Sequence, residues 1–183
     1  MKKLFKKTWF ALLLCVVCVV ASTLLNTRVK FGPLCDQARA GLYETDANGI
    51  DLRFELNDYC SCLDTLIDLA ASQGIDTAAA VEKSDALRGL LGREGVGARE
   101  LYSAYASLLA ETRALSDALG AYALGTHDSA TLQRCLGSLE SARSAIERFG
   151  YNAEIDAFLS KYDRFPTSTL ASAVGLRYPE RFA

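Results

Sequence analysis

Hydrophobic and polar positions divide the chain into one uninterrupted apolar run near its start and a series of periodic stripes after it. The run, Thr8–Leu25, contains no charged residue, and its only polar residues are Thr and Ser. A run of this length suffices to cross the hydrocarbon core of a bilayer as a helix. In lipid the backbone N–H and C=O groups must pair within the segment, so a helix is what it forms there. The pattern predicts a transmembrane anchor with its core at residues 8–25, inside a basic N-terminal region of residues 1–30.

A cleaved signal peptide is the alternative interpretation of this run. The lysines that precede it, its apolar middle and the small-residue pattern Val19-Val20-Ala21 all fit a secretory signal. The apolar run is longer than a usual signal core, however, and it continues through Ser22–Leu25 beyond that cleavage site. We therefore expect the anchor to be retained.

Beyond the run, apolar residues recur at steps of three and four, which aligns them on one face of a helix. The clearest stripe follows Ala98 and consists of Leu101, Tyr105, Leu108, Thr112, Leu115, Leu119 and Tyr122. Other helices are expected from Asp51 to Gly74, from Asp76 to Gly92, from Asp128 or Ser129 to Phe149, and from Tyr151 to Phe165. Shorter ones are expected to start at Pro33 and at Thr167 or Ser168.

These stripes predict an all-α fold, in which the transmembrane helix is followed by an antiparallel bundle of long helices of the four-helix type. Narrow apolar seams of this spacing pack helices at shallow angles, as in coiled coils and bundles. The bundle is expected to occupy residues 31–176, and residues 177–183 are expected to form a loosely packed C-terminal tail. Gly74 is expected to end its helix in the left-handed conformation.

Charge is unevenly divided along the chain. From Asp36 onward there are 14 basic and 22 acidic residues, a net charge of −8, although the whole chain carries only −2. Such an acidic domain does not attract nucleic acid, so no nucleic-acid partner is expected. The lysines before the anchor outnumber the basic residues that directly follow it. This bias favours a single-pass cell-membrane protein with its domain outside the cytoplasm.

Four cysteines lie in the expected domain, namely Cys35, Cys60, Cys62 and Cys135. Outside the cytoplasm a disulfide is plausible, and four cysteines allow three pairings. Cys60 and Cys62 sit two residues apart on one helix and therefore face different directions. Buried free thiols are the simpler interpretation. The spacing of the four does not match known zinc sites.

The C-terminal third carries a family resemblance. The stretch YNAEIDAFLSKYDRFPTSTLASAVGL, Tyr151–Leu176, resembles the C-terminal signature of the LemA family of bacterial membrane proteins. The matching residues are Tyr151, Asn152, Ile155, Phe158, Tyr162, Phe165, Pro166, Leu170 and Gly175. The chain departs from the signature where Leu159 replaces a second Asn and where Tyr162 replaces a smaller aliphatic residue.

The resemblance implies an N-terminal membrane helix, a mostly helical bundle and no established enzymatic activity. The residues themselves agree, since the single histidine, His127, has no partners for a catalytic or metal site, and no cofactor is expected. Asn152 is expected to fix helix register through hydrogen bonds across the bundle, with partner binding as the alternative. Our first hypothesis is a scaffold or interaction module with a protein partner. The second is an extracytoplasmic sensory or ligand-binding bundle.

Overall fold

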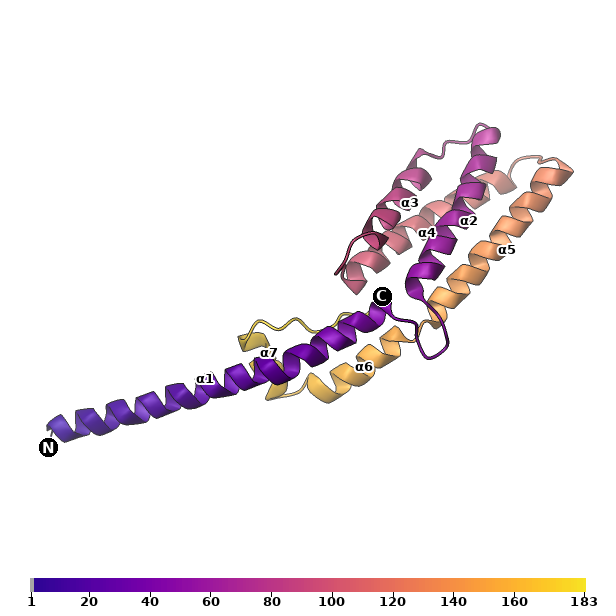
Figure 1. Ribbon diagram of the computed structural model, residues 1–183. Helices are drawn as coiled ribbons and strands as arrows, with labels where there is room; N and C mark the ends of the chain where they lie inside the picture. Colours follow the sequence, from indigo (N-terminus) through magenta and orange to yellow (C-terminus); the bar gives the residue numbers. More distant parts are fainter. Residues whose placement is uncertain (1) are drawn as a thin grey trace. The chain divides into compact units, whose positions relative to one another are not determined.

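The computed structural model describes the backbone of residues 2–183 and the side chains from residue 9 onward. The side chains of the N-terminal lysines therefore lie outside the described residues. Helices are the only regular secondary structure in the described chain, which contains no strand, and this confirms the all-α class (Figure 1). Its elements are α1 (Lys2–Ala40), the 3-10 helix η1 (Gly41–Tyr43), α2 (Leu52–Ser72), α3 (Ala78–Leu91), α4 (Ala98–Gly120), α5 (Thr126–Arg148), α6 (Tyr151–Tyr162) and α7 (Thr167–Ala173).

The chain forms two compact units. The first, called here the stem unit, consists of the residues up to Ala40 together with Glu154–Pro179. The second, called here the bundle unit, consists of Gly41–Ala153 and Glu180–Ala183. Each unit thus combines segments that are far apart in the sequence.

In the stem unit, α1 is one continuous helix in place of the two separate helices expected. Pro33 lies inside it and does not start a new helix. A proline removes one backbone hydrogen bond of a helix, but the flanking Phe31 and Cys35 are buried against Ala171 of α7 and hold the helix there. Upstream of these contacts, α1 includes a stretch long and apolar enough to cross a membrane, and none of that stretch is buried.

An aromatic cluster joins α1 to the C-terminal part of the stem unit. The ring of Phe31 lies 5.9 Å from that of Phe158, 5.2 Å from that of Tyr162 and 5.8 Å from that of Tyr178, centroid to centroid. The hydroxyl of Tyr178 donates to the carbonyl of Tyr162 at 3.1 Å. Aromatic pairs at these separations stabilise a core beyond the burial of their area.

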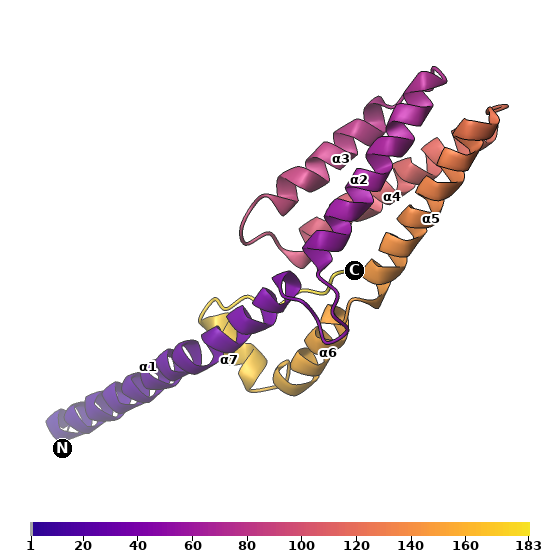
Figure 2. The same ribbon diagram turned by 45° about the vertical axis from the view of Figure 1, so that its right-hand side comes forward.

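In the bundle unit, α2 is the central helix and packs against α3, α4 and α5, while α3 also packs against α4 (Figure 2). The apolar stripes of the sequence form this core. The buried residues include Leu52, Leu56, Tyr59, Leu63 and Leu66 of α2, Leu101, Tyr105, Leu108, Leu115 and Leu119 of α4, and Leu132, Leu139 and Ile146 of α5. The periodicity therefore predicted the buried faces correctly, and Gly74 has the expected positive φ of 76°.

Several helix ends differ from the sequence-based expectations. Helix α5 begins at Thr126 with Gly125 as its N-cap, so Asp128 lies in the first turn and does not cap the helix. Tyr122 lies beyond the end of α4 and is exposed, so it does not extend the α4 stripe. The C-terminal tail is irregular, but its Phe182 is only 6% exposed. The expectation of a loosely packed tail is therefore wrong.

Candidate functional site

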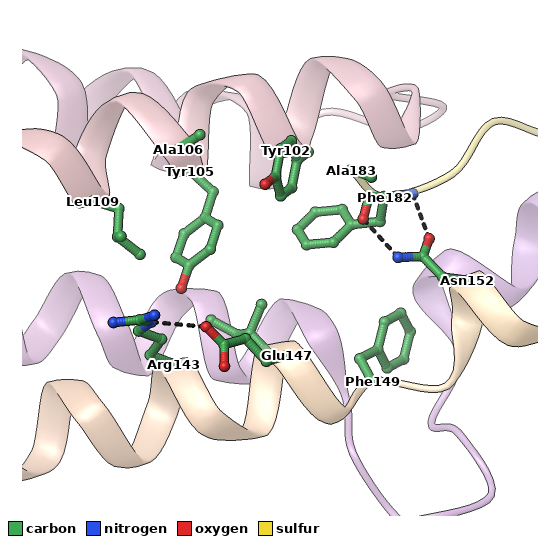
Figure 3. A pocket seen from close by; sticks show the side chains of 11 residues that line it. Tyr102, Tyr105, Ala106, Leu109, Arg143, Glu147, Phe149, Asn152, Phe182 and Ala183 are labelled. Carbon is green, nitrogen blue, oxygen red and sulfur yellow. Dashed lines mark hydrogen bonds and ion pairs between the residues drawn. The ribbon is translucent and has the colours of Figure 1, made fainter.

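A pocket lies between α4 and α5 in the bundle unit. These two helices scarcely pack against each other, although each packs against α2. The space between them forms a cavity of about 440 Å³, called here the α4–α5 pocket (Figure 3). Its walls are Tyr102, Tyr105, Ala106 and Leu109 of α4, Arg143, Ile146 and Glu147 of α5, and Phe149, Asn152, Phe182 and Ala183.

Tyr105 is the most unusual residue of this pocket. Its position in the α4 stripe directs it inward, and it is only 5% exposed. Its ring meets that of Tyr59 edge-on at 5.5 Å. Its hydroxyl is buried and has no hydrogen-bond partner among the described residues. It points across the pocket towards Arg143 and Glu147 (Figure 3).

The environment of this hydroxyl keeps it protonated. Burial raises the pKa of Tyr105 far above its ordinary value, and the neighbouring Tyr59 raises it further. A buried hydroxyl without a partner costs about 1–3 kcal/mol of desolvation. Tyr105 therefore has an unused hydrogen-bond donor and acceptor in the wall of the pocket.

Arg143 is the cation of the pocket and is held by acidic residues on its own helix. Its Nε donates to Glu147 Oε1 at 2.8 Å, and its Nη1 lies 3.7 Å from Glu140 Oε2. These partners are spaced four and three residues from Arg143, which places all three side chains on one helix face. The hydrogen bond with Glu147 and the charges of both glutamates raise the pKa of Arg143 above its ordinary value.

The C-terminal segment closes one end of the pocket. The ring of Phe182 meets that of Tyr102 edge-on at 5.2 Å and lies 6.4 Å from that of Tyr105. The side-chain amide of Asn152 donates to the Phe182 carbonyl at 2.8 Å and accepts its N–H at 2.7 Å. Asn152 thus has a structural role, but its partner is the C-terminal backbone and not a neighbouring helix.

A second cavity continues the same groove along α4 and α5. It has a volume of about 310 Å³ and shares Leu109 and Arg143 with the α4–α5 pocket. Tyr59 of α2 is one of its lining residues. Burial raises the pKa of Tyr59, and its polar interaction with Thr112 partly offsets that rise. In contrast to Tyr105, Tyr59 thus has a polar side chain beside its hydroxyl.

The structure does not gather the residues of the LemA-like signature into one site. Tyr151 and Asn152 belong to the bundle unit, whereas Ile155, Phe158, Tyr162 and the later residues belong to the stem unit. Tyr151 and Ile155 are buried, and Leu170 is half-buried. Phe165 is 85% exposed and precedes Pro166 in a cis peptide bond, and Gly175 has a positive φ of 69°. Of the signature, only Asn152 lines the pocket.

The four candidate cysteines are free thiols in the structure. Cys35, Cys60 and Cys135 are buried and Cys62 is half-buried. Cys35 belongs to the stem unit and the other three to the bundle unit. Within the described residues, no group of three His, Cys, Asp or Glu side chains is arranged to hold a metal ion.

Most of the pocket residues were not singled out by sequence reasoning. Tyr102, Arg143, Glu147 and Phe182 went unnoticed, although the spacing of Arg143 and Glu147 was a signal for an ion pair on α5. A tyrosine at a buried stripe position, as at Tyr105, was a second signal, because its hydroxyl needs a partner. Comparisons with family models, with curated proteins and with solved structures give no significant match to this chain.

Proposed function

We propose that this chain is a non-enzymatic, membrane-anchored helical bundle of the LemA type that acts as a scaffold or interaction module. The observation that carries the proposal is the apolar surface of α1. From Trp9 to Leu25 every side chain is exposed except the half-buried Leu24. Removing one Leu, Val or Phe side chain from water is worth about 1.5–3 kcal/mol. A bilayer removes all of them at once.

A single-pass arrangement in the cell membrane follows from this proposal. The lysines ahead of the apolar run support placing the bundle unit outside the cytoplasm, because basic residues favour the cytoplasmic side. A protease added to intact cells tests the orientation. Cleavage in the loop between α3 and α4, at its exposed residues 92–95, is expected, and full protection in intact cells with cleavage only after lysis contradicts it.

The groove between α4 and α5 supports an interaction role for the bundle unit. It runs along two helices, and its walls combine aromatic rings with two arginines, Arg113 and Arg143, which are residue types enriched at protein interfaces. The proposed occupant is a segment of a protein partner. A photo-crosslinking residue at Ala106, in the wall of the groove, tests this in intact membranes.

The matched control carries the same crosslinker at Asp85, an exposed position on α3. We expect one discrete crosslinked product from position 106 and none from position 85. Equal products from both positions, or none from either, contradict a partner in the groove.

A second candidate function, a sensory or ligand-binding bundle, is favoured by the Tyr105 hydroxyl. The pocket volume of about 440 Å³ falls within the range of small-molecule sites. An apolar molecule carrying one hydrogen-bond acceptor would contact the rings and satisfy that hydroxyl. Native mass spectrometry of protein from gently solubilised membranes tests this. The native chain should carry the extra mass of a bound molecule, and Ala106→Trp, which fills the pocket, should lose it. The proposal is contradicted if the native chain carries no extra mass, or if both chains carry the same extra mass.

A further inference from the structure

The aromatic cluster of the stem unit fixes how far its C-terminal part lies from the apolar run of α1. Tyr162, the last residue of α6, has its ring 5.2 Å from that of Phe31. Phe31 follows Leu25 by six residues, which corresponds to about 9 Å along a helix. The headgroup layer of a bilayer extends about 5–8 Å beyond its hydrocarbon core. Tyr162 therefore lies just outside that layer when α1 spans the membrane.

The chain after Tyr162 continues back towards the membrane. The stem-unit part of α6 runs antiparallel to α1, so the chain moves back towards the N-terminus of α1 as it approaches α7 (Figures 1 and 2). Among residues 9–30, only Leu24 and Thr27 are half-buried. Both lie on the face of Phe31, seven and four residues before it, which is the face that packs against α7. The face of α1 that packs inside the stem unit thus extends as far as Leu24, at the end of the apolar run.

The turn between α6 and α7 has the chemistry of a membrane-interface contact. Phe165 at its tip is 85% exposed, the most exposed large hydrophobic side chain described. Lys161 and Arg164 beside it are exposed, and Asp163 is the one acidic residue of the turn. Arg28 and Lys30 of α1 are exposed at the same end of the apolar run. At a membrane surface, Phe side chains are buried at the boundary between headgroups and acyl chains, and basic side chains are attracted to the anionic headgroups.

We propose that the α6–α7 turn is a second membrane contact, in which Phe165 inserts its ring among the lipid headgroups while Lys161 and Arg164 bind their phosphates. The proposal rests on the spanning role of α1 proposed above. The occupant of this surface is the bilayer that α1 itself enters, because the turn packs on the same helix. The contact fixes the tilt and rotation of the stem unit relative to the bilayer, which a lone helix leaves free.

Tryptophan fluorescence tests the proposal in the full chain, because Trp9 is its only tryptophan. The chain is reconstituted into vesicles of phosphatidylcholine and phosphatidylglycerol, either unmodified or brominated near the headgroup. Two variants replace Trp9 by Phe and carry one new tryptophan, through Phe165→Trp or through Phe54→Trp. Phe54 is an exposed residue of α2 and serves as the control.

The tryptophan introduced at position 165 should emit at shorter wavelength in vesicles and lose emission in brominated lipid, whereas that at position 54 should do neither. Trp9 of the native chain lies at the edge of the apolar run and should also be quenched by the lipid brominated near the headgroup. If Trp9 is not quenched, the spanning helix itself is wrong. If Trp9 is quenched but position 165 is not, the turn does not touch the bilayer, and a blue shift there without quenching assigns it to a protein contact. Equal quenching at positions 165 and 54 also overturns the proposal.

Discussion

The carboxylate of Asp46 accepts the backbone N–H of Gly150 at 2.8 Å, across 104 residues of the chain. The same carboxylate accepts the backbone N–H groups of Asn48 and Ile50, each at 2.8 Å. A Cβ atom at position 150 would approach Asp46 Oδ2 to 3.2 Å, so glycine permits this contact. One side chain therefore joins the loop before α2 to the turn after α5.

The first prediction concerns the pH dependence of this contact. Partial desolvation raises the pKa of Asp46, but hydrogen bonds from the backbone of Ile50, Gly150 and Asn48 outweigh it and leave the pKa below its ordinary value. A carboxyl whose pKa is lowered by folding stabilises the fold above its unfolded pKa, and loses that contribution as the pH falls through its folded pKa. Asp46→Asn should therefore lower the melting temperature at pH 7.

The difference between Asp46→Asn and the native chain should shrink as the pH is lowered below the ordinary range of aspartate, about 4. Thermal unfolding monitored by circular dichroism measures this difference in melting temperature. Asp58→Asn, at an exposed position in the second turn of α2, is the control and should leave the melting temperature unchanged. A difference that stays constant from pH 7 to pH 3 would show that the charge of Asp46 does not stabilise the loop.

The second prediction concerns Asn152 and the C-terminal segment. Asn152→Ala removes both hydrogen bonds to the Phe182 backbone, each worth about 0.5–1.5 kcal/mol. We expect the free energy of unfolding to fall by about 1–3 kcal/mol and the amide of Phe182 to exchange faster with deuterium. Asn57→Ala is the control, because the Asn57 amide donates only to a carbonyl of its own exposed helix face. Unchanged exchange at Phe182 would contradict the structural role of Asn152.

The third prediction compares two buried tyrosines. Tyr59→Phe loses the polar interaction with Thr112 and should destabilise the fold by about 1 kcal/mol. Tyr105→Phe removes a hydroxyl that has no partner, so it should leave stability unchanged or raise it. Chemical unfolding of the two variants measures both effects. A loss of stability in Tyr105→Phe as large as that in Tyr59→Phe would mean that its hydroxyl is satisfied in the free protein.

The fourth prediction concerns thiol reactivity. Burial raises the pKa of Cys35 and Cys60, and both side chains are fully buried, so neither should react with a maleimide at pH 7. Of Cys35, Cys60, Cys62 and Cys135, only Cys62 is half-buried, so it should be labelled first among these four, and more quickly as the pH rises, because burial raises its pKa as well. Labelling followed by peptide mass spectrometry measures the order. Modification of Cys62 only after reduction would instead indicate that it is held in a disulfide.

The local features of the fold could be predicted from the sequence, because they depend on residues close together in the chain. The stripe through Leu101, Tyr105 and Leu108 lies in the core as its spacing indicates. Pro33 misled the prediction, since tertiary packing of Phe31 and Cys35 overrides the local tendency of proline to interrupt a helix.

The candidate site could not be predicted, because it depends on contacts between distant segments. Phe182 closes the pocket only because Asn152, 30 residues earlier, holds its backbone. The pocket itself exists because α4 and α5 pack against α2 and scarcely against each other. Periodicity shows which face of a helix is buried, but not which helices leave a space between them.

The central claim is that α1 remains attached and holds the bundle unit at a membrane. The most direct test is intact mass measurement of the chain after membranes are washed in alkaline carbonate. We predict that the chain stays in the washed membranes and that its mass includes residues 9–25. Recovery of the chain in the soluble wash, with the mass of a polypeptide whose first residue is Ser22, would contradict the account.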